Sequence, residues 1–368
     1  MKIRREYLEK SRTISDSQTL VVDMPITDPI SAITVIYEAN NGGTSNQGVY
    51  LHDDVDSIEL VDGSEEIFSL NGIETLVLNC FELKKWPYAL LTEAADSSQY
   101  EAFTMHFGRY IGDPLYWLDP GEFRNLQVRL AHSLTISATA GFATGTGSVD
   151  VIAHVFADRP ASRNGYFIAK EQYSFTSAAS GDEKISLPTD YPYRLLIQRM
   201  QEDGIAINTD ITNVKLNAGG GAFVPVDMDT LDIVQLNAGE FGEFELFYDL
   251  LRTDGDSDSF HLHDIRGYVA NAVNDLDVAS VDAQTVNTLT LQLLSLTTTP
   301  GISKSTTDTQ IGLRINGYCP FGSIVVPLGD PNDPETWFDP TLYGSVDLVL
   351  TQGAAGATCN TILQQVRR

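Results

Sequence analysis

Short runs in which every second residue is apolar recur along the whole chain. Leu126–Leu130 and Ser148–Phe156 alternate most cleanly, and the same pattern returns in Val286–Leu294, Thr309–Ile315, Ser345–Thr351 and Thr358–Val366. This period places one face of a strand in a core and the other toward water or a neighbour. Clusters of Gly, Asn, Asp and Pro separate the runs, as at 40–43, 217–221 and 330–332. The pattern predicts many short strands joined by turns.

Two stretches follow a helical period instead. In NGIETLVLNCFELKK (71–85), apolar residues recur at spacings of three and four: Ile73, Leu76, Val77, Cys80 and Phe81. A weaker stripe of Met228, Leu231 and Val234 predicts a second short helix, with Asp227 as its N-cap. The chain is therefore predicted to be an all-β protein with short helices in its inter-strand connections.

The second half of the chain repeats features of the first in the same order. A Pro-containing turn precedes the strand at 33–37 and again the strand at 195–200. The stretch 58–63 is matched by 214–219, and 74–76 by 229–231. The three offsets are 163, 156 and 155 residues. They indicate a duplicated unit with its boundary near 158–165, and two β-sandwiches rather than a propeller, which needs four or more shorter repeats.

Composition fits two folded domains with an acidic surface. The 368 residues are 42% hydrophobic and 20% charged, and the formal net charge is −27. Such a surface repels polyanions, which argues against sequence-specific nucleic-acid binding by the body. Basic residues nevertheless gather at both termini: Lys2, Arg4, Arg5, Lys10, Arg12, Arg367 and Arg368. They are interpreted as facing an anionic partner, with solvated terminal charge as the alternative.

The cysteines and the N-terminus suggest where the chain is made. Cys80, Cys319 and Cys359 are an odd number in a long chain, which implies no disulfide framework and favours synthesis in the cytoplasm with reduced thiols. Arg4-Arg5 is superficially like a twin-arginine signal, but the polar stretch EKSRTISDSQ follows, so we expect no export signal.

Several of these segments together resemble a known family. IELVDGSEEIFSLNGIETLVLN (58–79), FTMHFGRYIGD (103–113) and SVDVIAHV (148–155) are similar to the first jelly roll of double jelly-roll major capsid proteins. The second half adds ISLPTD (185–190) and the closing strand pair at 344–351 and 359–366. These proteins come from tailless icosahedral viruses of prokaryotes, often with an internal membrane, in the lineage that includes the adenovirus hexon. The segments 251–284 and 295–343 carry no such likeness.

The resemblance implies two tandem eight-stranded jelly-roll sandwiches and a virion location. The expected boundaries are a basic N-terminal arm at 1–18, a first roll at 19–160 and a second roll at 161–368 with longer loops. The chain is expected to form homotrimeric, pseudo-hexagonal capsomers that contact neighbouring capsomers and penton or vertex proteins. The basic termini would face the internal viral membrane or the genome. Segment 251–284 is expected to form a projection or an inter-capsomer loop.

The chemistry of an enzyme is not visible in the sequence. There is no phosphate-binding G-x-x-x-x-G-K-[ST], no G-x-S-x-G elbow and no H-E-x-x-H, so we expect no catalytic residues and no required cofactor. Asp254, Asp256 and Asp258 have the opening spacing of a calcium loop and are predicted to hold a structural Ca²⁺. Asp53, Asp54 and Asp56 form a second such cluster, and His261 with His263 a weaker metal candidate; solvated turns are the alternative.

Two other classes of protein remain open. A secreted carbohydrate-binding or adhesion β-sandwich would use the aromatic stretch 107–117 as a sugar-stacking face, but it predicts an export signal. A β-sandwich glycosidase could place a catalytic carboxylate pair among the 50 acidic residues. The aromatic stretch is interpreted instead as a plug at one end of a sandwich or as a subunit contact.

Overall fold

The structure is a computed structural model that describes all residues except Met1, Asp254, His261, 264–268, 274–277, 297–301 and 305–308. Side chains are further left undescribed at 263, 269–273, 278–285, 294–296 and 302–304. No helix in the described part of the chain is both long and apolar enough to cross a membrane.

The first half of the chain folds into a sandwich of two sheets. One has the order β1-β9-β3-β7 and the other β2-β8-β4-β5. Apart from the short β6 beside β7, these are strands one, eight, three and six facing strands two, seven, four and five, the arrangement of a jelly roll. The strands are β1 (Ile3–Thr13), β2 (Ser17–Asp23), β3 (Ile30–Asn40), β4 (Val55–Asp62), β5 (Glu65–Leu70), β6 (Ala89–Thr92), β7 (Ser98–His106), β8 (Leu126–Ser133) and β9 (Ser148–Phe156).

The second half repeats this topology. Its two sheets have the orders β10-β26-β12-β24 and β11-β25-β13-β14, again one-eight-three-six and two-seven-four-five. The strands are β10 (Tyr166–Thr176), β11 (Gly181–Leu187), β12 (Tyr193–Gln201), β13 (Ile211–Ala218), β14 (Phe223–Asp229), β24 (Ser323–Val325), β25 (Val346–Gln352) and β26 (Thr358–Arg367). The predicted duplication and the two all-β jelly rolls are therefore confirmed, and the matched segments fall on equivalent strands β3 and β12, then β4 and β13.

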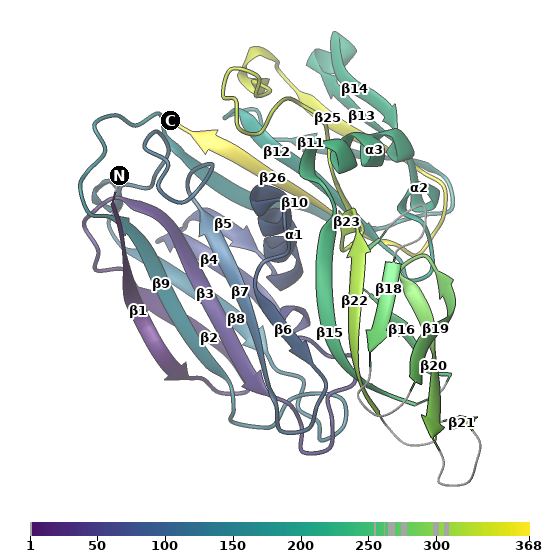
Figure 1. Ribbon diagram of the computed structural model, residues 1–368. Helices are drawn as coiled ribbons and strands as arrows, with labels where there is room; N and C mark the ends of the chain where they lie inside the picture. The colour runs from purple at the N-terminus through teal and green to yellow at the C-terminus, as the bar shows by residue number, and fades with distance from the viewer. Residues whose placement is uncertain are drawn as a thin grey trace.

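The two rolls lie side by side and share a sheet (Figure 1). Strand β5 of the first roll pairs in parallel with β10 of the second, through Phe68 opposite Ala169 and Ser69 opposite Lys170. The boundary predicted at 160–161 lies in the connection 157–165, between β9 and β10.

Residues 3–13 are not a separate arm in this structure. They form β1, which pairs antiparallel with β9 from Ile3 opposite Phe156 to Thr13 opposite Ser148. Strand β1 occupies the first-strand position of the jelly roll, so the first roll begins at Ile3, whereas the sequence placed its start at 19. The predicted boundary rested on the cluster of basic residues. In the structure, however, the pairing of β1 with a distant strand makes this segment part of the first roll.

Among the described residues, three α-helices and four short 3₁₀ turns lie between strands: α1 (Gly72–Leu83), α2 (Ile207–Asp210), α3 (Thr230–Phe241), η1 (Leu51–Asp53), η2 (Pro120–Glu122), η3 (Gly219–Gly221) and η4 (Pro340–Leu342). Helices α1 and α3 both follow the fifth strand of their roll. Asn71 caps α1, since its side chain accepts from the Glu74 N–H at 2.8 Å while Glu74 accepts from the Asn71 N–H. Helix α3 is capped at Asp229 and not at the predicted Asp227, because β14 runs on through Met228.

The second roll carries an insertion between α3 and β24. It comprises β15 (Phe244–Arg252), β16 (Ser257–Ser259), β17 (Leu262–His263), β18 (Val269–Val273), β19 (Val278–Thr285), β20 (Thr288–Leu296), β21 (Ile302–Lys304), β22 (Thr309–Gly317) and β23 (Cys319–Pro320). Strand β15 pairs in parallel with β6, so the insertion extends a sheet of the first roll to β1-β9-β3-β7-β6-β15-β22-β18. The predicted projection at 251–284 belongs to this insertion. The strand predicted at 286–294 starts too early, because the turn at Asn287 (φ 47°) precedes β20.

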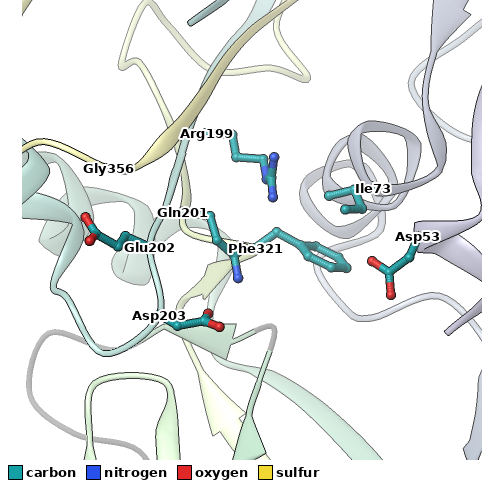
Figure 2. A pocket seen from close by; sticks show the side chains of 8 residues that line it. All are labelled: Asp53, Ile73, Arg199, Gln201, Glu202, Asp203, Phe321 and Gly356. Carbon is teal, nitrogen blue, oxygen red and sulfur yellow. The ribbon is translucent and has the colours of Figure 1, made fainter. Parts of the chain in front are cut away.

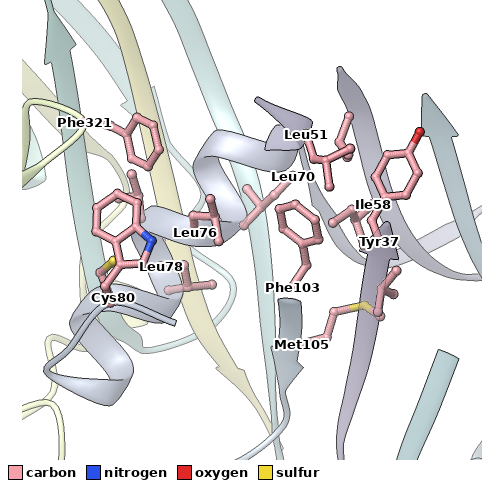
Figure 3. Close-up of a cluster of buried hydrophobic side chains, with 14 of the residues drawn as sticks. Tyr37, Leu51, Ile58, Leu70, Leu76, Leu78, Cys80, Phe103, Met105 and Phe321 are labelled. Atoms are coloured by element: carbon pink, nitrogen blue, oxygen red, sulfur yellow. The ribbon is translucent and has the colours of Figure 1, made fainter. Parts of the chain in front are cut away.

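The main core fills the first roll and continues past α1 into the insertion (Figure 3). Helix α1 is buried on most sides, which explains why Leu78 is buried although it lies off the predicted stripe. Strands β12 and β26 are buried along almost their whole length on both faces, whereas alternation at 358–366 predicted one exposed face. The second face is covered because Leu195 and Ile197 pack into the core of the first roll. All three cysteines are buried.

Candidate interaction surfaces

Both chain termini lie at the same end of the molecule (Figure 1). The Ala157 N–H donates to the Lys2 carbonyl at 3.0 Å, and Tyr166 of β10 lies opposite Arg367 of β26. The connection 157–165 thus holds the first and last strands of the chain together. We call this region the terminal end; it gathers Lys2, Arg4, Arg5, Arg367 and Arg368.

Strand β1 separates the remaining two predicted basic residues from this group. A strand advances about 3.3 Å per residue, so Lys10 and Arg12 lie toward the other end of the molecule. The Arg12 guanidinium forms an ion pair with Glu9 at 2.6 Å. Sequence reasoning grouped them with Lys2 because it treated the segment as an arm.

The basic residues of the terminal end differ in their partners. Arg4 forms ion pairs with Glu6 (3.0 Å) and Asp28 (2.8 Å), and Arg367 pairs with Glu65. Over the part of the chain that the structure describes, no ion pair involves Lys2, Arg5 or Arg368. These three side chains therefore carry the uncompensated positive charge of the terminal end.

Arginines stack on aromatic rings beside the termini. Arg159 and Arg163 lie 5.3 and 5.2 Å from the Trp117 ring centre, and Arg163 lies 5.4 Å from that of Tyr166. Trp117 and Tyr166 are buried, as expected of a plug at the end of a sandwich. Tyr110, by contrast, is 54% exposed. The terminal end is thus basic and aromatic on an otherwise acidic protein.

A buried charged network joins the two rolls. The Arg194 guanidinium of β12 lies 3.2 Å from the Glu82 carboxylate of α1 and donates to the Gln364 side chain at 2.5 Å. It also donates to the Pro331 carbonyl at 3.0 Å and lies 4.7 Å from the Phe167 ring centre. Burial lowers the pKa of Arg194, although Glu82 opposes the shift. We call these residues the seam network.

Two of the predicted calcium residues, Asp256 and Asp258, lie beside another buried ion pair. Arg252 pairs with Glu93 of the first roll and with Asp258, so the Asp258 carboxylate already has a cationic partner. Asp256 accepts hydrogen bonds from the Thr253 N–H and hydroxyl at 2.8 and 3.0 Å. Asp254 lies outside the described residues, as do His261 and the side chain of His263. Calcium binding here stays a prediction.

The second acidic cluster does not converge on one point. Asp54 accepts from the Thr135 N–H and hydroxyl, both at 2.8 Å. Asp53 and Asp56 line two different hollows. Across the described residues, no group of three or more His, Cys, Asp or Glu side chains is arranged to hold a metal ion.

One hollow of about 330 Å³ lies where the rolls meet (Figure 2). Asp53 and Ile73 of the first roll face it, and the second half contributes Arg199, Gln201, Glu202, Asp203, Phe321 and Gly356. Burial lowers the pKa of Arg199, opposed by Glu74 and Asp53. The lining contains both acidic and basic side chains, as expected of a hollow whose charged groups hold the two rolls together.

Two exposed apolar faces lie on the outside of the sheets. On the first, Leu90 of β6 and Phe247 of β15 (55% exposed) directly precede the paired residues Leu91 and Tyr248, and Tyr88, just before β6, is 73% exposed. On the second, Phe223 and Val224 of the edge strand β14 are exposed, and Phe223 stacks on Tyr343 at 5.7 Å, next to the exposed Leu342. We call them the β6–β15 face and the β14 face. Sequence reasoning missed the first, because no local signal reveals that β6 and β15 are adjacent.

The architecture defines the class of protein: two jelly rolls of identical strand order in one chain, joined edge to edge. No protein-family model and no curated protein sequence matches the chain. Solved structures do match it over its whole length.

The crystal structure of the major capsid protein of Sulfolobus turreted icosahedral virus is 12% identical, covers 100% of this chain and 97% of its own, and has a TM-score of 0.58. The same virus in its atomic structure gives 11% identity, coverage of 100% and 91%, and a TM-score of 0.60. The major capsid protein of bacteriophage PM2 gives 8% identity, coverage of 100% and 98%, and a TM-score of 0.55. The chain has the double jelly-roll fold of viral major capsid proteins, as the sequence resemblance implied.

Proposed function

We propose that this chain is the major capsid protein of a tailless icosahedral virus and that its role is structural, not catalytic. The observation that carries the proposal is the pair of jelly rolls with one strand order, set side by side and joined by the β5–β10 pairing. The full-length likeness to capsid proteins supports it. The protein would be made in the host cytoplasm and end in the virion.

A homotrimer is the assembly that this duplication favours. Three copies of a two-roll block present six similar units around one axis, so similar walls can meet many neighbours in a closed shell. The β6–β15 face and the β14 face are our candidates for these walls, since exposed apolar clusters often mark contacts. Neighbouring capsomers and vertex proteins would be the further partners.

Molar-mass measurement of the intact chain tests this assembly. We expect a stable species of three times the chain mass of 40.3 kDa, and shells under assembly conditions. Phe247→Asp and Phe223→Asp each place a charge on one candidate face, and at least one should weaken the trimer or the shell. A monomer at all concentrations, unchanged by either variant, would contradict the proposal.

The terminal end is proposed to face an anionic internal membrane. Lys2, Arg5 and Arg368 supply positive charge there without an ion-pair partner among the described residues, and the acidic body would be repelled by the same surface. Replacing all three by Ser should reduce binding to vesicles containing anionic lipid while sparing the trimer. Deletion of 1–12 is unsuitable, because it would remove strand β1.

A control that removes two positive charges, against three in the test variant, lies on the same strand. Lys10 and Arg12, both replaced by Ser, remove charge from the opposite end of β1 and should leave vesicle binding unchanged. Equal loss in both variants would mean that overall charge, not position, governs binding. Binding to nucleic acid but not to vesicles would replace the membrane by the genome as the partner.

A further inference from the structure

Helices α1 and α3 are attached to their rolls by the same pair of hydrogen bonds. The Asn79 side chain of α1 donates to the Thr104 carbonyl of β7 at 2.7 Å and accepts from the Thr104 N–H at 2.8 Å. The Asn237 side chain of α3 makes the same two bonds to Val325 of β24, at 2.9 and 2.6 Å. Helix α3 therefore occupies in the second roll the place that α1 occupies in the first.

Both helices carry an acidic residue, a leucine and a second acidic residue at intervals of four, which places them on one helix face. In α1 the side chains of this stripe are buried: Glu74, Leu78 and Glu82. The positions that correspond to them in α3, aligned on the two asparagines, are exposed: Asp232, Leu236 and Glu240. Leu236 is 50% exposed, although Leu78 is fully buried. We call the exposed set the α3 stripe.

The surface that covers α1 has a counterpart on the first roll. Leu78 belongs to the same buried cluster as Ile197 of β12 and Ile362 of β26. These two residues lie opposite each other in the second roll. In the first roll the equivalent strands are β3 and β9, on which Thr34 lies opposite Ile152. Thr34 and Ile152 therefore hold the positions of the two residues that α1 covers.

A further pairing supports this register. Thr34 also lies opposite Thr104, the residue that the asparagine of α1 binds. Ile197 lies opposite Val325, the residue that the asparagine of α3 binds. In both rolls a shift in the strand pairing comes shortly before this position. The helices and the sheets of the two rolls thus correspond residue by residue.

The counterpart on the first roll is open. Thr34 and Ile152 are partly exposed, whereas Ile197 and Ile362 are fully buried. Tyr7 of β1 lies opposite Ile152 and is 55% exposed. We call Thr34, Ile152 and Tyr7 the β3–β9 face. The chain therefore has one uncovered helix stripe and one uncovered sheet face that correspond to the two sides of its own inter-roll contact.

We propose that the α3 stripe of one copy packs on the β3–β9 face of a second copy, which repeats between chains the contact that α1 makes within the chain. The inference rests on the proposed trimer, whose contact surfaces it names. Figure 1 shows α3 and strands β1, β9 and β3 on opposite sides of the molecule, as a head-to-tail ring requires. Ser31 holds the position of Arg194, the partner of Glu82. The contact between copies should therefore be weaker than the seam network.

Dissociation of the intact protein on dilution, followed by molar mass, tests this contact. Leu236→Asp and Ile152→Asp each place a charge in it, and both positions are accessible in the single chain, so the fold should persist. Each variant should raise the concentration of half-dissociation at least about tenfold, equivalent to about 1.4 kcal/mol. Ile136→Asp is the control: Ile136 is 44% exposed on the loop between β8 and β9, and its variant should dissociate like wild type.

A cysteine pair gives a second readout. A chain with both Leu236→Cys and Ile152→Cys should form disulfide-linked species of three chains on oxidation, which neither single variant can form because the native cysteines are buried. The inference is overturned, and the trimer stands, if wild type is a trimer that neither charge weakens and the cysteine pair does not link. A wild type that is monomeric at all concentrations overturns both the trimer and this contact.

Discussion

The seam network predicts a large cost for removing Arg194. In Arg194→Met the chain loses the ion pair with Glu82, two neutral hydrogen bonds and the contact with Phe167. Glu82, whose side chain is 2% exposed, keeps two donors, the Gln364 amide at 2.8 Å and the Asn79 amide at 3.3 Å. Removing one partner of a buried ion pair costs about 3–5 kcal/mol, and the remaining donors place our expectation near the lower value.

A second partner makes this cost depend on pH. The His106 Nε2 lies 4.0 Å from Glu82, and burial lowers the pKa of His106, with Arg194 lowering it further. A histidine with a folded-state pKa below its unfolded value destabilises the protein as pH falls through the unfolded value. Without Arg194, protonated His106 can neutralise Glu82. The stability difference between wild type and Arg194→Met should therefore be smaller at pH 5.5 than at pH 8.

Urea unfolding followed by tryptophan fluorescence at both pH values measures these differences. Arg314→Met is the matched control: its pair with Glu245 is about half exposed, and exposed pairs contribute about 0–1 kcal/mol. The double variant Glu82→Met with Arg194→Met should recover part of the loss, since no buried charge remains. The reasoning fails if Arg194→Met costs no more than Arg314→Met, or if its cost is the same at both pH values.

Two further predictions concern single positions. Burial raises the pKa of Glu74 to about 7, so its folded form favours the proton and this stabilisation is lost as pH rises from 4.5 to 7. Glu74→Gln keeps the cap of α1. The change in the free energy of unfolding that this substitution causes, measured by urea unfolding, should be more favourable at pH 8 than at pH 5 by about 1–3 kcal/mol; the same change at both pH values would contradict this. Gly165→Ala would place a Cβ 2.2 Å from the Arg367 carbonyl at φ +137°. It should lower the unfolding temperature and expose the terminal end to proteolysis, whereas Gly145→Ala, which meets no atom within 4 Å, should leave that end protected.

Local pattern predicted the elements of this fold well. Strand β9 has the bounds that alternation gave it, and the spacing of Ile73, Leu76 and Val77 marks α1. These signals succeed because they record which face of an element meets a core. They fail at β26, where alternation implied a face toward water or a neighbour, since α1 and the first roll cover that face.

Pairing between strands that are far apart in the chain could not be predicted from the sequence. Nothing local reveals that β1 pairs with β9, or that β15 lies beside β6 more than 150 residues away in the chain. The sequence therefore predicts one group of basic residues, although β1 places Lys2 and Lys10 toward opposite ends of the molecule.

The two rolls share a topology but have different surroundings, and this asymmetry bears on assembly. The second roll buries β12 and β26 against α1 and the first roll, and its insertion in turn extends a sheet of the first roll past β6. Neither roll could be exchanged for the other without exposing Leu195 and Ile197 or losing the β6–β15 pairing. A ring of three such blocks would present six rolls whose outer walls alternate in chemistry, with Phe247 on one kind and Phe223 on the other. Contacts between blocks in a shell would then have to alternate too, so charges placed at Phe247 and at Phe223 should interrupt different stages of assembly.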